Sequence, residues 1–426
     1  MTRTALGPGL ALAVALGLTG AACAETIVIR AAAYVDVDAG KLVAPAILVI
    51  EDGEIADVNP IKAPRADRTI DLGTMTLVPG LVDTHTHLTM DLSRGHEMDS
   101  TVATPADFAL LAAFNARKTL LAGFTTVRDL GAYGFADVAI GRAIDQGIAV
   151  GPDIIPSGHA VGITGGHCDI TGLGPGVLET GPEKGIGDGP DELVKAIRYQ
   201  IKHGAEVVKI CATSGVLSNE ATAGAQQTSL EELKAAVEEA HRHEVRIAAH
   251  AVGTDGIIAA AVAGVDSIEH ASMLNADAVD AIKANDTYVV PTLYLLNAVD
   301  PSSLPPAMRK KGEAVRAAAF QSFRLALENG VKIAFGTDAG VFAHGDNAKE
   351  LTTRVDLGQD PAEAIRSATI YAVDLLGLKD RGRIRAGYRA DLIAVEGNPL
   401  ADIRTLEHVK FVMQKGVEVR QVALQR

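Results

Sequence analysis

Residues 81–88 read LVDTHTHL, and this stretch decides the predicted fold. It is a continuous apolar run of the kind that forms a buried parallel strand, and it changes at its end to His85 and His87. Helical patterns separate it from further apolar runs at residues 125–131, 153–161, 207–212, 246–251, 267–272, 288–293 and 332–340. Eight strands alternating with helices are typical of a (β/α)₈ TIM barrel. We therefore predict an α/β fold of this kind over residues 79–380.

Both ends of the chain differ from this middle region. Residues 25–78 and 381–426 contain short alternating runs punctuated by Gly, Asp and Pro, which are β-hairpin signals. They predict one small β-sandwich-like domain built from both termini. Residues 1–24 combine an early arginine, an apolar run and a small-x-small pattern before Glu25, as a cleaved secretory signal peptide does. We expect an exported protein, periplasmic or secreted, without a membrane association in its mature form.

Composition narrows the class of protein. The chain has 426 residues, of which 48% are hydrophobic, so it can bury a large core without disulfide or zinc staples. Its 39 Lys and Arg residues against 53 Asp and Glu residues give a net charge of −14. An acidic surface argues against nucleic acid or anionic lipid as the main partner.

Polar side chains stand in or at the ends of the expected strands, where a buried strand otherwise stays apolar. They are His85, His87, Lys209, His250, His270 and Asp338. Because the carboxyl ends of barrel strands meet at one mouth, we expect these side chains to converge. Any single histidine is more often a structural residue. Imidazoles and a carboxylate in this number are the ligands of a divalent metal, so the set predicts a metal site.

Lys209 requires a separate explanation. A protonated lysine is repelled by a metal, and a buried one without a partner is costly. If its amine adds carbon dioxide, the resulting carbamate offers two anionic oxygens that can bridge two metals. The alternative is an ordinary lysine paired with a nearby carboxylate. We predict the carboxylated form of Lys209.

Two other residue pairs are interpreted as structural. Arg128 and Asp129 look like a pair near the barrel wall. Cys168 and Cys211 are too few for a disulfide framework and lie beside the candidate site. We expect both cysteines to be buried free thiols.

The motifs VDTHTHL, KICATSGVLS, GVDSIEHAS and GTDAGVFAHGDNAKEL together resemble the amidohydrolase superfamily. More narrowly, they are similar to its binuclear metal-dependent carboxypeptidase and dipeptidase branch. That branch includes Xaa-Pro and Xaa-Arg dipeptidases and enzymes that cleave N-acyl amino acids, some of them acting on ochratoxin A. The resemblance also implies a homo-oligomer, since relatives are commonly oligomeric and some are octamers.

The resemblance implies two metal ions, usually zinc. His85, His87 and Asp338 would hold the more buried ion, and His250 and His270 the second, with the carboxylated lysine bridging both. A hydroxide between the metals would attack the amide carbonyl. Asp338 would take its proton and pass it to the leaving nitrogen.

Four further residues are candidates for contact with the substrate. His167 and His159 lie in a Gly-rich loop after the third expected strand and could contact the oxyanion or a substrate carboxylate. His344, just beyond the last expected strand, could contact the substrate or be a turn residue. Val252 stands where relatives often carry a polar residue, which indicates a more apolar pocket.

The sequence thus predicts a hydrolase that cleaves the amide bond before a C-terminal amino acid in dipeptides or N-acyl amino acids. A lactonase or esterase, or a deaminase or cyclic-amide hydrolase of the same superfamily, is the alternative. Lys209 argues against the deaminases, which usually lack it. A non-catalytic binding protein ranks third, because no expected metal ligand is missing.

Overall fold

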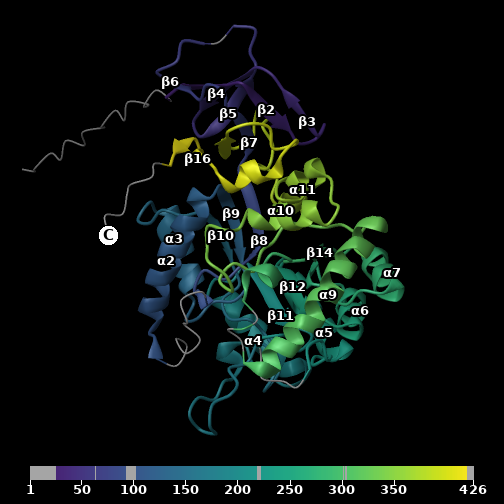
Figure 1. The fold of residues 1–426 in the computed structure, drawn as a ribbon. Helices are drawn as coiled ribbons and strands as arrows, with labels where there is room; N and C mark the ends of the chain where they lie inside the picture. The colour runs from purple at the N-terminus through teal and green to yellow at the C-terminus, as the bar shows by residue number, and fades with distance from the viewer. Residues whose placement is uncertain are drawn as a thin grey trace, which may run out of the picture.

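A computed structural model describes residues 25–62, 64–92, 102–217, 222–300, 302 and 305–419 (Figure 1). The predicted signal peptide at residues 1–24 lies outside the described residues. The described chain has an α/β architecture with a sheet-rich part at one end, drawn at the top of Figure 1. Both termini contribute to that part, since purple and yellow segments meet there.

Two sheets make up the sheet-rich terminal part. One has the order β5-β4-β1-β6 and the other the order β17-β16-β15-β7-β2-β3. In the second sheet β7 pairs antiparallel with β15, which joins the two ends of the chain. The strands are β1 (Ile27–Ala31), β2 (Ala33–Asp36), β3 (Lys41–Val43), β4 (Ala46–Glu51), β5 (Glu54–Val58), β6 (Arg68–Asp71), β7 (Thr76–Pro79), β15 (Leu392–Val395), β16 (Phe411–Gln414) and β17 (Val417–Glu418).

The central part contains parallel strands in two groups, β10-β9-β8 and β11-β12-β13-β14. Their side chains are almost all buried, which explains why the sequence shows continuous apolar runs rather than alternation. The strands are β8 (Leu81–Thr86), β9 (Phe124–Asp129), β10 (Asp153–Pro156), β11 (Val207–Cys211), β12 (Arg246–Ala251), β13 (Ser267–His270) and β14 (Tyr288–Val290).

Single parallel bridges connect these two groups. They join Val161 to Ile210, Val289 to Ile333 and Thr86 to Ala339. The last strand expected from the sequence, at residues 332–340, is therefore present only as isolated bridges and not as a regular strand. The physical reason is local: Asp338 has a φ of 63° and Gly340 a φ of 120°, and neither angle belongs to an extended strand.

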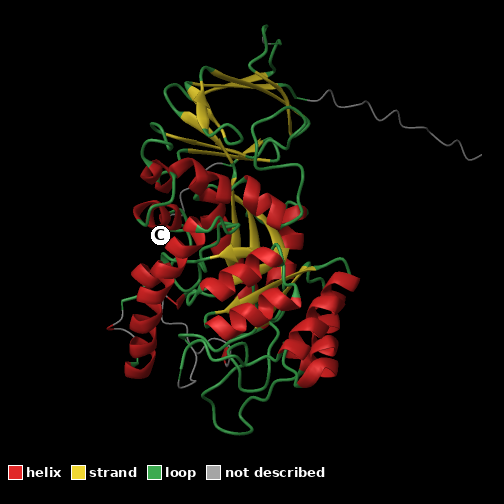
Figure 2. Ribbon diagram, turned by 90° about the vertical axis from the view of Figure 1, so that its right-hand side faces the viewer, coloured by secondary structure: helices red, strands yellow, loops and turns green. Residues whose placement is uncertain are grey.

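Helices cover the central strands, as Figure 2 shows in red around the yellow strands. Two of the helices, Pro105–Leu121 and Leu230–Arg242, begin with a complete capping box, Thr104 with Asp107 and Ser229 with Glu232. The helices are α2 (Pro105–Leu121), α3 (Ala136–Asp145), α4 (Gly189–Lys202), α5 (Leu230–Arg242), α6 (Thr254–Ala263), α7 (Ala276–Ala284), α8 (Leu295–Ala298), α9 (Pro306–Glu328), α10 (Lys349–Asp356), α11 (Pro361–Ser367) and α12 (Ile370–Leu375). Short 3₁₀ helices are η2 (Pro182–Lys184) and η4 (Ile403–Glu407).

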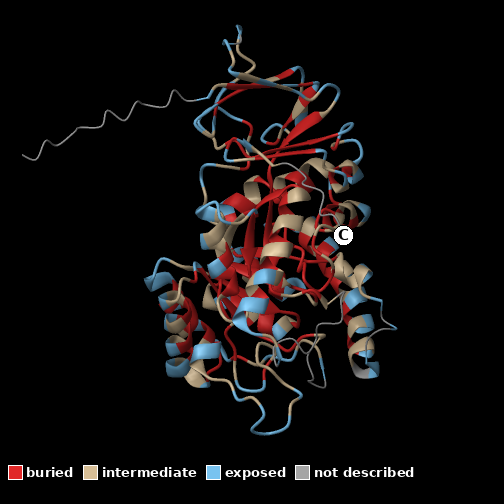
Figure 3. Ribbon diagram, turned by 90° about the vertical axis from the view of Figure 1, so that its left-hand side faces the viewer, coloured by how far each residue is buried: buried red, intermediate tan, exposed pale blue. Residues whose placement is uncertain are grey.

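The buried core runs through the central strands and the inner faces of the helices, shown in red in Figure 3. Within the described part of the chain, none of the helices is both long enough and apolar enough to cross a bilayer. The central strands are thus buried supports for the side chains at their ends.

Candidate metal centre

His85, His87 and Asp338 form a compact group in which each residue offers one ligand atom, and these atoms lie within 4.8 Å of one another. Oδ1 of Asp338 is 3.1 Å from Nε2 of His87 and 3.5 Å from Nε2 of His85. His85 lies in β8 and His87 directly follows that strand, while Asp338 follows β14 by almost fifty residues. The predicted convergence of these strand ends is therefore present in the structure.

The other candidate histidines continue from this group as a row of neighbouring rings. The ring centre of His270 is 5.2 Å from that of His85 and 4.7 Å from that of His250. His167, from the loop after β10, follows at 4.1 Å from His250. Imidazoles from three different strands and one loop thus gather at the carboxyl ends of the central strands.

Three of these histidines are held in the same way, by a hydrogen-bond partner at Nδ1. The partners are Glu269 Oε2 for His85 at 2.8 Å, the Gly131 carbonyl for His87 at 3.2 Å and Thr292 Oγ1 for His270 at 2.7 Å. In each ring Nε2 is then the nitrogen that can face a metal, and in His85 and His87 it lies 3.5 Å and 3.1 Å from Asp338 Oδ1. Metal-binding histidines are held by such outer partners, which fix the ring plane and the tautomer.

The backbone at this end of the strands adopts conformations that non-glycine residues rarely use. His270 and Ala271 have φ angles of 72° and 47°, Thr292 has 48° and Asp338 has 63°. Each such residue costs about 1–3 kcal/mol, and such residues cluster at functional sites. Three of these four residues are a candidate ligand or the partner of one.

Burial favours the neutral, metal-binding form of the candidate histidines except at His87, where burial is outweighed by the hydrogen bond with Asp338, which raises the pKa. Burial lowers the pKa of His270 to about 4 and the pKa values of His85 and His250 well below the usual range, so these rings are neutral. Burial also lowers the pKa of the Lys209 amine, in β11, to about 8. A larger share of this amine is therefore uncharged near neutral pH, the form that reacts with carbon dioxide.

The residues present fit a divalent metal ion. Nε2 of His250 is buried and has no hydrogen-bond partner within the described residues, although a buried polar atom normally has one. Neutral imidazole nitrogens and a carboxylate are ligands that zinc accepts. An ion at this place would satisfy the unpartnered nitrogen.

Asp83, which the sequence analysis did not single out, organises the support of the site. Its carboxylate accepts hydrogen bonds from the backbone amides of His85 and Thr337, both at 3.1 Å. It also accepts from the Thr337 hydroxyl at 2.6 Å and from Nδ2 of Asn347 at 2.8 Å. Asp83 therefore ties β8 to the segment that carries Asp338. A buried aspartate inside an apolar strand was the signal that could have found it.

Two of the residues predicted to contact substrate, His159 and His344, lie outside the row of neighbouring histidine rings and are bonded to other parts of the fold. The ring of His159 contacts Gln200 Oε1 at 3.2 Å through Nδ1 and accepts from the Gly134 amide through Nε2. The buried ring of His344 lies between the Thr119 hydroxyl and the His87 carbonyl, each at 3.1 Å. Both nitrogens of each ring thus have partners in the protein fold.

Val252 is buried two residues after His250. Its amide donates to the Thr213 hydroxyl and its carbonyl accepts from the Met273 amide. The structure therefore places Val252 near the strand end, where its backbone links the loops after β11 and β13 to β12.

The expectation of free thiols is wrong, because Cys168 and Cys211 form a disulfide with a Cα–Cα distance of 5.9 Å. Cys211 ends β11, and Cys168 lies in the loop that runs beside it. Cysteine spacing alone could not reveal this proximity. The bridge fixes the loop immediately after His167, the histidine that stacks near His250.

The expected pairing of Arg128 with Asp129 is also wrong. Adjacent side chains on a strand point to opposite faces, so the two cannot meet. Arg128 instead donates to Glu269 Oε1 at 2.9 Å, across the interior of the central strands. Asp129 accepts from the Leu88 amide at 2.5 Å and supports the end of β8 from the other side.

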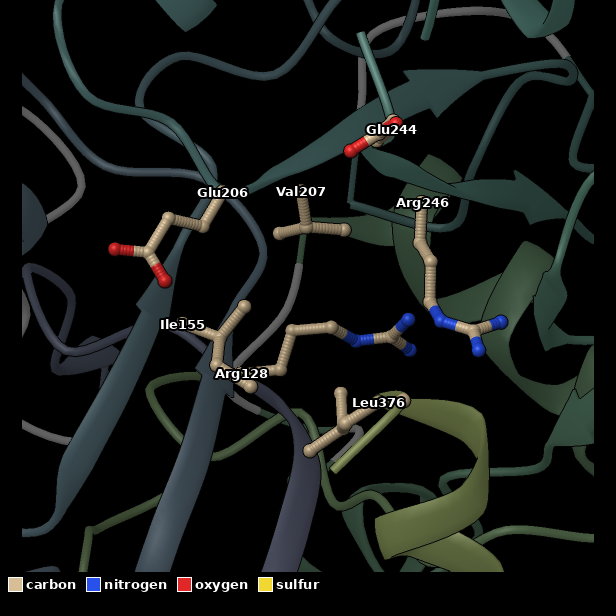
Figure 4. Close-up of a pocket in the computed structure, with 8 residues that line it drawn as sticks. Arg128, Ile155, Glu206, Val207, Glu244, Arg246 and Leu376 are labelled. Carbon is tan, nitrogen blue, oxygen red and sulfur yellow. The ribbon is translucent and has the colours of Figure 1, made fainter. Parts of the chain in front are cut away.

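A cavity of about 300 Å³ lies away from the histidines, at the amino ends of β11 and β12 (Figure 4). Arg128 and Arg246 point their guanidinium groups to the same side of it. Arg246 pairs with Asp266 at 3.0 Å. The remaining lining residues are Ile155, Glu206, Val207, Glu244, Leu376 and Gly377. The candidate metal ligands are not among them.

Comparison with known proteins is consistent with this geometry. The family model "Amidohydrolase family" matches residues 76–419. The chain is 35% identical to ochratoxinase of Aspergillus niger over 399 residues, which cover 88% of this chain and 82% of that protein.

Solved structures agree. A Xaa-Pro dipeptidase with bound methionine in the active site is 35% identical, with a TM-score of 0.88 over 93% of this chain and 100% of that one. A prolidase complexed with N-methylphosphonate-L-proline is 30% identical, with a TM-score of 0.84 over the same shares. The chain therefore belongs to the amidohydrolase family and is a hydrolase of carbon–nitrogen bonds in the dipeptidase and ochratoxinase branch.

Proposed function

We propose that this protein is a metal-dependent amide hydrolase that releases a C-terminal amino acid from dipeptides or N-acyl amino acids. Ochratoxin A, in which an aromatic acid is joined to phenylalanine, belongs to this substrate class. The observation that carries the proposal is the row of buried imidazoles ending at Asp338, with Lys209 in the strand beside that of His250.

Two divalent ions, with zinc as the expected metal, are part of this proposal. His85, His87 and Asp338 would hold one ion, and His250 and His270 the other. The carboxylated side chain of Lys209 would bridge them. When bound, such ions supply a water that ionises near neutral pH and polarise the amide carbonyl.

The side chains of the chain itself would carry out the remaining steps. The Asp338 carboxylate would accept a proton from the attacking water and deliver it to the leaving nitrogen, because an amide nitrogen departs only when protonated. His167, one ring beyond His250, would donate a hydrogen bond to the carbonyl oxygen or to the substrate carboxylate. His159, His344 and Val252 would shape the walls around these groups.

The parallel bridges around the central strands support a closed (β/α)₈ barrel as the scaffold. Export is also part of the proposal. The Cys168–Cys211 disulfide supports it, since disulfides persist in oxidising compartments. A homo-oligomer that acts on small molecules, with no nucleic acid partner, completes the proposal. The lactonase and deaminase alternatives are not favoured by the relatives found.

Hydrolysis of matched substrate pairs tests the function. The zinc-loaded protein would be assayed with Xaa-Pro, Xaa-Arg and Xaa-Phe dipeptides, N-acetyl amino acids and ochratoxin A. Each would be paired with its C-terminal methyl ester, and a lactone and a phosphotriester would serve as controls. We expect amide cleavage that requires the free carboxylate. Cleavage of the lactone or the phosphotriester alone would contradict the proposal.

A further inference from the structure

A buried chain of polar groups connects His85 to the opposite side of the central strands. Nδ1 of His85 lies 2.8 Å from Oε2 of Glu269. The other oxygen of this carboxylate, Oε1, accepts from Arg128 at 2.9 Å and from the Ser267 hydroxyl at 2.6 Å. The side chains of His85, Glu269 and Arg128 are all at most 1% exposed. Water therefore cannot substitute for any member of the chain.

Arg128 is itself fixed in place. Its Nε donates to the Thr84 carbonyl at 2.6 Å, and its second terminal nitrogen donates to the Ser267 hydroxyl at 3.1 Å. The guanidinium is thus held by two strands, and it occupies one oxygen of Glu269. The other oxygen can only accept a hydrogen bond, so Nδ1 of His85 must carry the proton. The lone pair of His85 is then at Nε2, on the side of Asp338.

We propose that Arg128, Ser267 and Glu269 are positioning residues that fix the tautomer and ring plane of His85 for metal binding. This inference rests on the metal site of the proposed function. A carboxylate at Nδ1 also makes the imidazole a stronger ligand. Among the candidate ligands His85, His87 and His270, only His85 has an anion at Nδ1, since the partners of the other two are neutral oxygens.

Stability alone gives a weak reason for this arrangement. A buried ion pair is often no more stabilising than apolar side chains of the same volume. Arg246 borders the same cavity as Arg128, but its ion pair with Asp266 lies where both side chains reach solvent. The Arg128–Glu269 pair differs because its free oxygen is directed at a candidate ligand.

Glu269→Gln is the decisive variant, because it keeps the shape and removes one acceptor. The amide oxygen would face Arg128 and Ser267, and the amide NH₂ would face Nδ1 of His85. His85 would then carry its proton at Nε2 and lose the lone pair that binds metal. We expect zinc affinity to fall by about 10- to 100-fold. Zinc chloride buffered with nitrilotriacetic acid would measure it, together with zinc per chain.

Thermal unfolding with and without zinc separates positioning from a structural role. If Glu269 positions His85, the rise in melting temperature on adding zinc shrinks in Glu269→Gln. If Glu269 only supports the fold, the melting temperature falls equally in both conditions and zinc affinity is unchanged. That second result would overturn the inference. Glu239→Gln is the matched control, since Glu239 also binds an arginine, Arg198 at 2.6 Å, but on the outer helix α5.

Ser267→Ala keeps the proposal testable if Glu269→Gln does not fold. It removes the hydroxyl that bonds both Arg128 and Glu269 and keeps both charges. We expect a smaller loss of zinc affinity than in Glu269→Gln, about two- to fivefold, because the contacts of Glu269 with Arg128 and His85 remain. Unchanged affinity in this variant would overturn the inference. A wild-type protein that binds no zinc would overturn the metal site itself, a distinct result.

Discussion

The two ends of the central strands carry titratable side chains of opposite character. At the carboxyl ends, imidazoles meet one another and the Asp338 carboxylate, and no lysine or arginine pairs with that carboxylate among the ion pairs of the described residues. At the amino ends, the arginines that border the cavity have carboxylate partners, as Arg246 has Asp266. The arginines at the amino ends therefore have their partners within the protein, whereas the imidazoles at the carboxyl ends have lone pairs directed at one place. Only the carboxyl-end arrangement requires a ligand.

Replacing Asp338 tests the difference most strongly. Asp338→Asn removes the proposed proton acceptor and an anionic ligand, so we expect kcat to fall by about 10²- to 10⁴-fold. Arg246→Met, at the amino ends, is the matched change and should leave kcat within about twofold. Steady-state kinetics on one dipeptide measures both. Equal effects of the two substitutions would remove the distinction between the two ends.

The disulfide affects only the carboxyl-end region, because it fixes the loop after His167. Replacing Cys168 and Cys211 by alanine opens a loop of 43 residues, and we expect a loss of about 2–4 kcal/mol in unfolding free energy. Urea unfolding with and without a reductant measures this effect. The reductant should change the wild-type protein and leave the double variant unchanged. A wild-type protein insensitive to reductant would contradict the bridge.

Thr292→Val sharpens the comparison within the row of histidines. It removes the hydroxyl at Nδ1 of His270 and keeps the side-chain volume. We expect a 10- to 100-fold loss of zinc affinity, the usual cost of removing an outer partner. Thr287→Val is the control, since the Thr287 hydroxyl bonds the Val265 carbonyl at the start of the neighbouring strands. Zinc affinity should be unaffected there.

His344 is a buried imidazole at this end whose two ring nitrogens already have partners in the protein fold. Burial lowers its pKa to about 4, against 6.5 in an unfolded chain. Between these values the unfolded state binds a proton that the folded state excludes, so stability falls as the pH drops. From pH 7 to pH 5 this removes about 2 kcal/mol. His344→Gln should show a correspondingly smaller decrease in urea unfolding of the metal-free protein. If His344→Gln and the wild-type protein showed the same pH dependence, His344 would not be a buried imidazole with a lowered pKa.

Much of this site could be predicted because its residues break the apolar pattern of the strands. The histidines, Lys209 and Asp338 each interrupt a buried run near its end, and the structure brings His85, His87 and Asp338 together. Glu269 broke the same pattern, one residue before His270, but its partner could not be inferred. That partner, Arg128, lies 141 residues away along the chain.

The missed features are those that depend on proximity in space. The Cys168–Cys211 bridge and the wall positions of His159 and His344 follow from how the loops fold over the strand ends. Periodicity describes single elements and carries no information about loop paths. The last strand was expected over residues 332–340 because this run is apolar, but the positive φ angles of Asp338 and Gly340, which periodicity does not reveal, interrupt it.

Metal content, measured together with hydrolysis, tests the central claim most directly. The variant for this test is Lys209→Met, which keeps the length and the apolar stem of the side chain and removes the amine. The wild-type protein and this variant would be reconstituted with zinc and carbon dioxide and then analysed for zinc per chain. We predict two ions and cleavage of the preferred dipeptide in the wild type, with at most one ion and lost cleavage in the variant. Two ions and undiminished cleavage in Lys209→Met would contradict the bridging lysine and the proposed binuclear centre.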